Sequence, residues 1–193
     1  MVEMLDKKVN MKIGFCGTMS VGKTTLVNAL KDLSEFVDFE FATERSKYLR
    51  DLGIPLNTDS TLKGQTIFLA ERCSELLKEK IITDRTIIDV MAFTRQAKSI
   101  SVIDGDDYCE YAKRFIREYD YLFYVSPDGV EMEDNGIRTT DIQYREKIDQ
   151  EIRMLLHQYV PTYYTIKGTT EERIQQIKEV IDMQYLYKKY IND

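Results

Sequence analysis

The chain has 193 residues, which corresponds to about one domain and is long enough to bury a core without disulfides or metals. Hydrophobic residues make up 43% of it and charged residues 31%, a balance that argues against collagen, coiled coil and wholesale disorder. Its 27 lysines and arginines against 33 aspartates and glutamates give a net charge of −6, which disfavours nucleic acid as a partner but permits a local phosphate pocket.

The cysteine and hydropathy patterns bear on the cell compartment. The three cysteines lie far apart without zinc-ligand spacing, and their odd number argues against a disulfide framework. No run approaches the length of a membrane-spanning helix, and the first ten residues lack the apolar region of a secretory signal. We therefore expect a cytoplasmic protein without a membrane segment, in which residues 1–10 are a short extension and 11–193 form a single domain.

Predicted strands and helices alternate along the chain. Short apolar runs indicate the strands, 3.6-residue periodicity indicates the helices, and Thr169 and Glu172 form a capping box for the last helix. The elements in chain order are a strand at 12–16, a helix at 23–32, a strand at 37–41, helices at 44–52 and 61–79, a strand at 81–83, helices at 87–98 and 106–118, a strand at 121–125, a helix at 140–159, a strand at 163–167 and a helix from 169.

This alternation predicts a three-layer α/β fold. Strands separated by helices imply βαβ units, and right-handed crossovers place helices on both faces of a five-stranded, mostly parallel sheet. Ligands of such folds bind where the strands end. The loops that follow strands, at 17–24, 42–45, 84–86 and 126–138, therefore open on one side of the sheet.

One loop matches a phosphate-binding motif. Residues 17–24 fit G-x-x-x-x-G-K-[ST] between a predicted strand and a predicted helix, the context that the motif requires. Gly17 and Gly22 permit the tight turns with which backbone N–H groups wrap a phosphate at a helix N-terminus. Lys23 would then reach the β- and γ-phosphates, and the Thr24 hydroxyl would ligate magnesium.

The whole loop is our predicted nucleotide site. Thr25 adds a hydroxyl that either contacts the α-phosphate or packs within the helix. The predicted nucleotide-binding residues are Gly17, Thr18, Met19, Ser20, Val21, Gly22, Lys23, Thr24 and Thr25. A phosphate loop predicts a bound nucleotide without deciding what is done with it.

Three activities compete for such a loop. A GTPase needs a guanine-reading N-K-x-D, which the chain lacks. A motor or AAA-type ATPase normally shows a strand ending in Asp-Glu, whereas the strand here ends on Asp84 followed by Arg85. A small-molecule kinase, with a second pocket for an acceptor and a cationic lid that excludes water, fits better.

Three segments together resemble P-loop nucleoside and nucleotide kinases: the phosphate loop, residues 84–93 and residues 133–138. Thymidylate kinases carry an Asp-Arg motif at the same place, although the neutral phosphate loop here differs from theirs. The sequence is more similar to the ribosylnicotinamide-kinase-like group, which pairs Asp-Arg with a Glu-Asp-Gly-x-Arg-type segment, here interrupted by Asn135. The likeness covers about residues 11–180 and implies ATP, Mg²⁺ and a lid at approximately 127–145.

Each candidate around this loop has a functional and a structural interpretation. Asp84 would hold a magnesium-bound water or orient the acceptor, or it would be the N-cap of the helix beginning near Ile87. Arg85 would neutralise the transferred phosphoryl group or grip an acceptor phosphate, or it would form a surface ion pair. Asp89 is a further acceptor-binding candidate.

The acceptor side and the lid supply the remaining candidates. The resemblance implies that Glu44 faces the acceptor pocket, where it would accept the hydroxyl proton or hold a substrate hydroxyl, with Arg45 as a companion. The alternative for Glu44 is a first-turn glutamate that interacts with the helix dipole. Arg138 would close on the triphosphate from the lid, whereas Arg145 has an ordinary helical partner in Asp141.

Aromatic residues allow two interpretations as well. They either line an acceptor pocket or pack in the core, the more usual role of any one of them. These residues are Tyr48, Phe68, Phe93, Tyr108 and Tyr111. The single histidine, His157, is interpreted as structural because metal sites need clusters of ligands.

The sequence thus predicts a cytoplasmic Mg-ATP-dependent kinase. Its catalytic residues would be Lys23, Asp84, Arg85, Glu44 and Arg138, its acceptor-binding residues Glu44, Arg45, Arg85 and Asp89, and its metal ligands Thr24 and Asp84. The acceptor is a nucleoside, a nucleotide or a ribosylnicotinamide-like molecule. A kinase acting on DNA or RNA, a nucleotide-dependent switch, a plain NTPase and a homodimer all remain open.

Overall fold

The computed structural model describes residues 10–43, 46–129 and 142–191. Five strands form one sheet in the order β2-β3-β1-β4-β5, and every neighbouring pair is parallel. The strands are β1 (Met11–Cys16), β2 (Glu40–Ala42), β3 (Lys80–Asp84), β4 (Tyr121–Val125) and β5 (Tyr164–Ile166). The mostly parallel sheet of the prediction is therefore parallel throughout.

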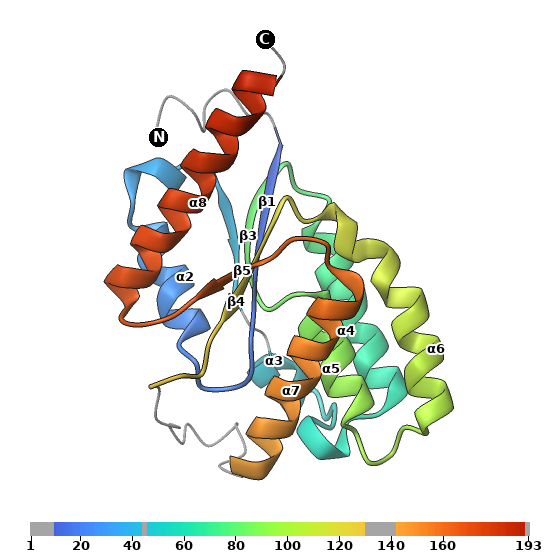
Figure 1. Cartoon of the computed structure of the whole chain (residues 1–193). Helices are drawn as coiled ribbons and strands as arrows, with labels where there is room; N and C mark the ends of the chain where they lie inside the picture. The colour runs from blue at the N-terminus through green and yellow to red at the C-terminus, as the bar shows by residue number, and fades with distance from the viewer. Residues whose placement is uncertain (1–9, 44–45, 130–141, 192–193) are drawn as a thin grey trace.

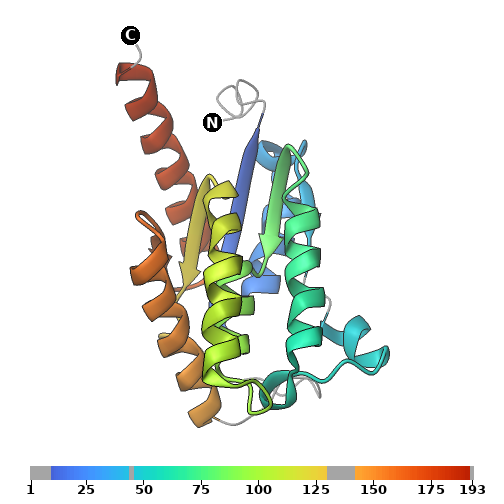
Figure 2. The same ribbon diagram turned by 90° about the vertical axis from the view of Figure 1, so that its right-hand side faces the viewer.

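Helices cover both faces of the sheet, as Figures 1 and 2 show. On one face lie α2 (Lys23–Lys31) and α8 (Thr170–Ile191). On the other lie α4 (Leu62–Glu75), α5 (Ile87–Arg95), α6 (Val102–Ala112) and α7 (Ile142–Tyr159). A short helix, α3 (Ser46–Asp51), follows β2, and short 3₁₀ helices occupy Ser34–Phe36, Asn57–Asp59 and Lys113–Glu118. The predicted three-layer arrangement is confirmed.

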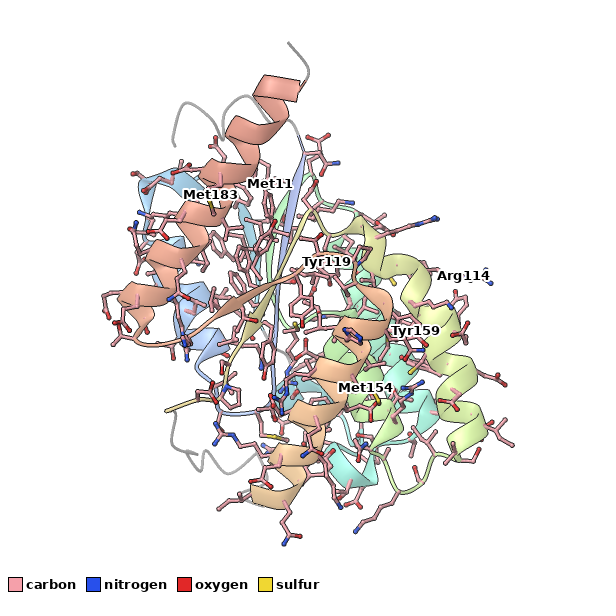
Figure 3. The ribbon with its side chains drawn as sticks, viewed as in Figure 1. Met11, Arg114, Tyr119, Met154, Tyr159 and Met183 are labelled. Atoms are coloured by element: carbon pink, nitrogen blue, oxygen red, sulfur yellow. The ribbon has the colours of Figure 1, made fainter. Side chains whose placement is uncertain are left out.

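The two layers of helices bury two separate cores. Alternate residues of β4 supply them, because successive strand side chains point to opposite faces. Phe123 packs with the α2 and α8 side, where it stacks on Phe15 of β1 at 5.4 Å between ring centroids. Leu122 and Tyr124 pack with the α4–α7 side, where Figure 3 shows the labelled Tyr119 among the side chains.

Several predicted elements have different bounds: the helices predicted at 61–79 and 87–98 end earlier, at Glu75 and Arg95, and in two other elements local contacts override propensity. The strand predicted at 37–41 begins only at Glu40, because Phe36 and Phe39 pack edge to face at 5.5 Å around a 3₁₀ turn. The helix predicted at 106–118 is α6, which begins at its N-cap Ser101 and gives way to a 3₁₀ turn after Ala112. Its first residues, Val102 and Ile103, are exposed, so they carry no signal of burial periodicity.

The register of the sheet places the carboxyl ends of its central strands together. Phe15, near the end of β1, pairs with Asp84 at the end of β3 and with Phe123 of β4. The capping box predicted for the last helix is present, with Thr169 N–H donating to Glu172 at 2.8 Å and Glu172 N–H donating back at 3.2 Å. None of the described helices is long and apolar enough to cross a membrane.

Candidate phosphate-binding and transfer site

The loop between β1 and α2 lies at the lower edge of the sheet in Figure 1 and has the shape of a nest. Three of its residues are left-handed, with φ of 151° at Gly17, 55° at Ser20 and 81° at Gly22. A Cβ at position 17 would lie 2.7 Å from the carbonyl oxygen of Val125, so only glycine fits there. The chain therefore turns tightly around its own backbone N–H groups, the geometry that binds anions.

The N-terminus of α2 is available for an anion. Gly22 is the N-cap, and among the described residues no side chain caps this helix end and no acidic residue occupies its first turn. The orphan N–H groups and the positive end of the helix dipole therefore face the loop without a protein anion to satisfy them.

Lys23 lies inside this loop and is 5% exposed. Its Nζ donates to the carbonyl oxygens of Gly17 at 2.5 Å and Thr18 at 2.7 Å, and lies 4.0 Å from a carboxylate oxygen of Asp89. The ammonium thus lies where a phosphate would be cradled, and it must leave the two carbonyls to reach the phosphate oxygens of a nucleotide.

The predicted magnesium ligands meet at the mouth of the loop. The Thr24 hydroxyl donates to the carboxylate of Asp84, which is 1% exposed at the end of β3. Both are hard oxygen ligands of the kind Mg²⁺ prefers, and magnesium usually needs only one or two protein ligands beside phosphate and water. The alternative interpretation of Asp84 as an N-cap is wrong, because Thr86 caps α5.

Asp89 holds the loop and α5 together. Its buried carboxylate accepts from Thr86 N–H at 2.8 Å, from the Thr86 hydroxyl at 3.0 Å and from Gly17 N–H at 3.2 Å. Thr86 and Asp89 form a capping box at the start of α5, and the Thr86 hydroxyl also accepts from Ile88 N–H at 3.2 Å. These contacts give Asp89 a positioning role, and the acceptor contact that we predicted for it stays a prediction.

Arg85 has a strained backbone at the end of β3. Its φ of 87° is left-handed, a conformation that costs a non-glycine residue about 1–3 kcal/mol and clusters at functional sites. Hydrogen bonds fix the preceding peptide on both sides: Arg85 N–H donates to Phe15 at 3.0 Å, and Asp84 C=O accepts from Arg72 at 3.3 Å. The guanidinium lies 5.0 Å from the centroid of the Phe93 ring, half-buried rather than on the surface.

Arg72, which no motif in the sequence indicated, supports this strand end. It is 3% exposed and forms an ion pair with Glu75 at 2.6 Å. Its position between Leu69 and Leu76 on the buried stripe of α4 is the signal that would have found it, because an arginine on an apolar face needs a buried partner.

Helix α7 contacts the phosphate loop. The Thr18 hydroxyl donates to the backbone carbonyl of Arg145 at 2.9 Å. One turn on, Asp149 accepts from the Tyr124 hydroxyl at 2.6 Å, and burial together with this carboxylate raises the pKa of Tyr124. The predicted candidates Glu44, Arg45 and Arg138 lie outside the described residues.

The aromatic candidates divide between site and core. Phe93 lies beneath Arg85 and contacts the Tyr144 ring edge to face at 6.4 Å, which places it nearest the site. Tyr108 donates its hydroxyl to the Gln65 carbonyl at 2.7 Å inside the helical layer, and Tyr48 and Tyr111 are exposed. The three cysteines are free, and burial raises the pKa of the Cys16 thiol well above its ordinary value.

A parallel sheet of this strand order, with a glycine-rich loop between its central strand and a helix, defines a P-loop fold of the nucleoside and nucleotide kinase type. A family model described as an AAA domain matches residues 12–173, and the chain belongs to that family. No curated protein matches the chain in sequence.

Several solved structures share the fold. Deoxyadenosine kinase from M. mycoides with bound dCTP is 19% identical at a TM-score of 0.59, over 90% of this chain and 98% of that one. Thymidylate kinase from Candida albicans is 16% identical at a TM-score of 0.67, over 91% and 92%. NadR protein in complex with NR is 14% identical at a TM-score of 0.71, over 93% of this chain but 52% of that one.

The end of β3 departs from the Asp-Glu pattern of AAA-type ATPases. The chain belongs to a family described as an AAA domain, yet β3 ends on Asp84 and is followed by a left-handed Arg85 instead of a glutamate. Membership in the family therefore does not by itself decide between hydrolysis of a nucleotide and transfer of its phosphoryl group.

Proposed function

We propose that the protein is an ATP- and magnesium-dependent kinase that transfers a phosphoryl group to a nucleoside, nucleotide or ribosylnicotinamide-like acceptor. The observation that carries the proposal is the contact of Asp84 with Thr24 of the phosphate loop, directly beside the strained Arg85. The carboxylate of Asp84 and the guanidinium of Arg85 are thus held near the point where a triphosphate in the loop would present its terminal phosphate. The kinases among the solved structures of this fold support the same conclusion.

The phosphates of ATP would occupy the nest at 17–25. Backbone N–H groups and the uncapped end of α2 would bind them, and Lys23 would exchange its two carbonyl partners for phosphate oxygens. Asp89 would keep the loop attached to α5 when Lys23 moves, because its carboxylate accepts from Gly17 N–H in addition to facing the Lys23 ammonium.

Thr24 and Asp84 would hold magnesium through oxygen atoms. In the described part of the chain no three His, Cys, Asp or Glu side chains form a metal cluster, and a magnesium ion shared with phosphates does not need one. When bound, the ion would neutralise charge on the phosphate oxygens. The protein's own part is to present one hydroxyl and one carboxylate at the mouth of the loop.

In the transfer step an acceptor oxygen attacks the γ-phosphorus in line. The new O–P bond forms while the bond to the bridging oxygen breaks and ADP leaves. A hydroxyl acceptor gives its proton to a carboxylate, the role proposed for Glu44, whereas a monophosphate acceptor attacks through an anionic oxygen. Arg85 and, from the lid, Arg138 would neutralise charge on the transferred group, and Arg45 would contact the acceptor. Catalysis is then mainly positioning and charge neutralisation.

The test is a panel of nucleosides, nucleoside monophosphates and ribosylnicotinamide, each incubated with Mg-ATP and analysed by mass spectrometry. Lys23→Ala is expected to abolish product while the circular dichroism spectrum is unchanged. Lys31→Ala, which removes the same charge from the other end of α2, is the matched control and is expected to retain full turnover. Equal product from wild type and Lys23→Ala would contradict the scheme.

Nucleotide hydrolysis is a second candidate, favoured by the family's description as an AAA domain. It predicts phosphate release from ATP at the same rate with and without any acceptor. The kinase proposal predicts little release without an acceptor, because water is a poor substitute for a bound hydroxyl.

A further inference from the structure

A buried arginine lies behind the phosphate loop. Arg173, in the first turn of α8, is 4% exposed. Its Nη1 donates to the carbonyl oxygen of Val21 at 2.7 Å, and its Nη2 contacts that of Ser126, just after β4, at 3.5 Å. One guanidinium therefore links the loop, the end of β4 and the last helix.

The Arg173 guanidinium has no carboxylate partner among the residues that the structure describes. Across residues 10–43, 46–129 and 142–191 no carboxylate pairs with it, and its buried Nε has no hydrogen-bond partner. Burial lowers the pKa of Arg173, and a cation in the first turn of a helix also opposes the helix dipole. A buried charge without a carboxylate partner is costly, and this cost offsets what the two hydrogen bonds to carbonyl oxygens contribute to the stability of the free protein.

The other buried cations near the site are paired. Arg72 forms an ion pair with Glu75 at 2.6 Å, and Lys23 lies 4.0 Å from Asp89. Arg173 differs from both in bonding only to backbone carbonyls. A cation held at such a place without a protein anion is balanced if an anion binds next to it.

The geometry places Arg173 directly against the turn that leads into α2. Its Nη1 would lie 3.1 Å from a Cβ at Gly22. In a trans peptide the N–H points opposite to the carbonyl, so binding the Val21 carbonyl turns the Gly22 N–H to the side away from Arg173. That N–H belongs to the uncapped end of α2.

We infer that Arg173 is a positioning residue for the phosphate loop, which fixes the Val21–Gly22 peptide and supplies a buried positive charge that a bound polyphosphate balances. The inference rests on the proposed function only in requiring that the loop binds phosphates. It predicts an uncommon combination, in which losing Arg173 weakens anion binding without weakening the free protein.

The experiment uses the whole chain and inorganic tripolyphosphate with Mg²⁺ as a probe that carries no base. Arg173→Met and Arg173→Gln remove the charge, and Arg173→Lys keeps it. Lys178→Met, on the same helix, is the matched control, because Lys178 is paired with Glu35 at 2.6 Å far along the chain from the loop. Titration calorimetry gives the affinity, and urea unfolding gives the stability of the free protein.

We expect Arg173→Met and Arg173→Gln to bind tripolyphosphate about tenfold more weakly than wild type, equivalent to about 1.4 kcal/mol. Their urea midpoints without ligand should equal or exceed that of wild type. Arg173→Lys should recover most of the affinity, and Lys178→Met should bind as wild type does.

Other results separate this inference from the kinase proposal. Wild-type affinity in Arg173→Met and Arg173→Gln, or a loss of affinity no smaller in Arg173→Lys, would overturn the inference alone. A wild-type protein that binds tripolyphosphate but phosphorylates no acceptor would overturn the kinase proposal and leave Arg173 its role. A wild-type protein that does not bind tripolyphosphate would overturn both.

Discussion

The contacts of Asp89 make it the most sensitive point of the candidate site. Its carboxylate accepts three hydrogen bonds, at 2.8, 3.0 and 3.2 Å, two from backbone N–H groups and one from a hydroxyl. Asp89→Ala would leave those buried donors unpaired, at about 1–3 kcal/mol each, and would remove the carboxylate near Lys23. Because neighbouring contributions are not additive, we expect a loss of about 3–5 kcal/mol in the free energy of unfolding.

Urea unfolding measures this loss, and α6 supplies the matched control. Asp104 occupies the same third position of a helix, with its N-cap Ser101 donating to its carboxylate at 2.7 Å, but it is exposed. Asp104→Ala should cost only about 0.5–1 kcal/mol. Asp89→Asn, which keeps one acceptor oxygen, should fall between the two.

The functional counterpart is a weaker response to nucleotide. In Asp89→Asn, which we expect to remain folded, the rise in melting temperature produced by Mg-ATP should shrink, because Gly17 and α5 are no longer held by a charge. A loss below 1 kcal/mol in Asp89→Ala, or equal losses in Asp89→Ala and Asp104→Ala, would refute the view that this carboxylate organises the loop.

Three further changes test the site and the core. Gly17→Ala should destabilise the fold by about 2 kcal/mol or more, because its Cβ would lie 2.7 Å from the Val125 carbonyl at a φ of 151°; urea unfolding measures it, and an unchanged midpoint would contradict the loop geometry. Arg85→Gly should keep the free energy of unfolding within about 1 kcal/mol of wild type, because relief of the left-handed strain offsets the lost contact with Phe93. The rate of phosphoryl transfer should fall at least about a hundredfold, and a retained rate would exclude Arg85 from the reaction. Burial raises the pKa of Cys109 from 9.0 to about 11, so between these pH values the folded state keeps a proton that the unfolded chain loses, and stability should fall as the pH rises from 9 to 11. Urea midpoints measured across this range should decline less in Cys109→Ala than in wild type. An identical decline in both proteins would rule out the thiol as its source.

The phosphate loop and the layered fold could be predicted because local and periodic signals specify them. The spacing of Gly17, Gly22 and Lys23 is a local signal that specifies a tight turn entering a helix. The apolar runs that became β1 and β4 are buried on both faces, which is the pattern of a parallel sheet.

The partners of the site residues could not be predicted, because they come from distant parts of the chain. Asp84 is a residue type typical of N-caps. Only the three-dimensional structure shows that its carboxylate contacts Thr24 and that Thr86 caps the helix instead. The left-handed φ of Arg85 is likewise imposed by bonds to Phe15 and Arg72, which no local pattern encodes.

The strand order has a consequence for how the chain acquires its site. Its earliest strand, β1, ends in the middle of the sheet, where Met11 pairs with Lys80 and Ile13 with Tyr121. Such distant pairings are entropically slow to close, so β1 stays without neighbours until much of the polypeptide has been synthesised. The turn that cradles anions therefore depends on segments that follow it by many residues, because Asp89 bonds Gly17 and Arg173 bonds Val21, and a ligand bound there reports that α5 and α8 have already docked.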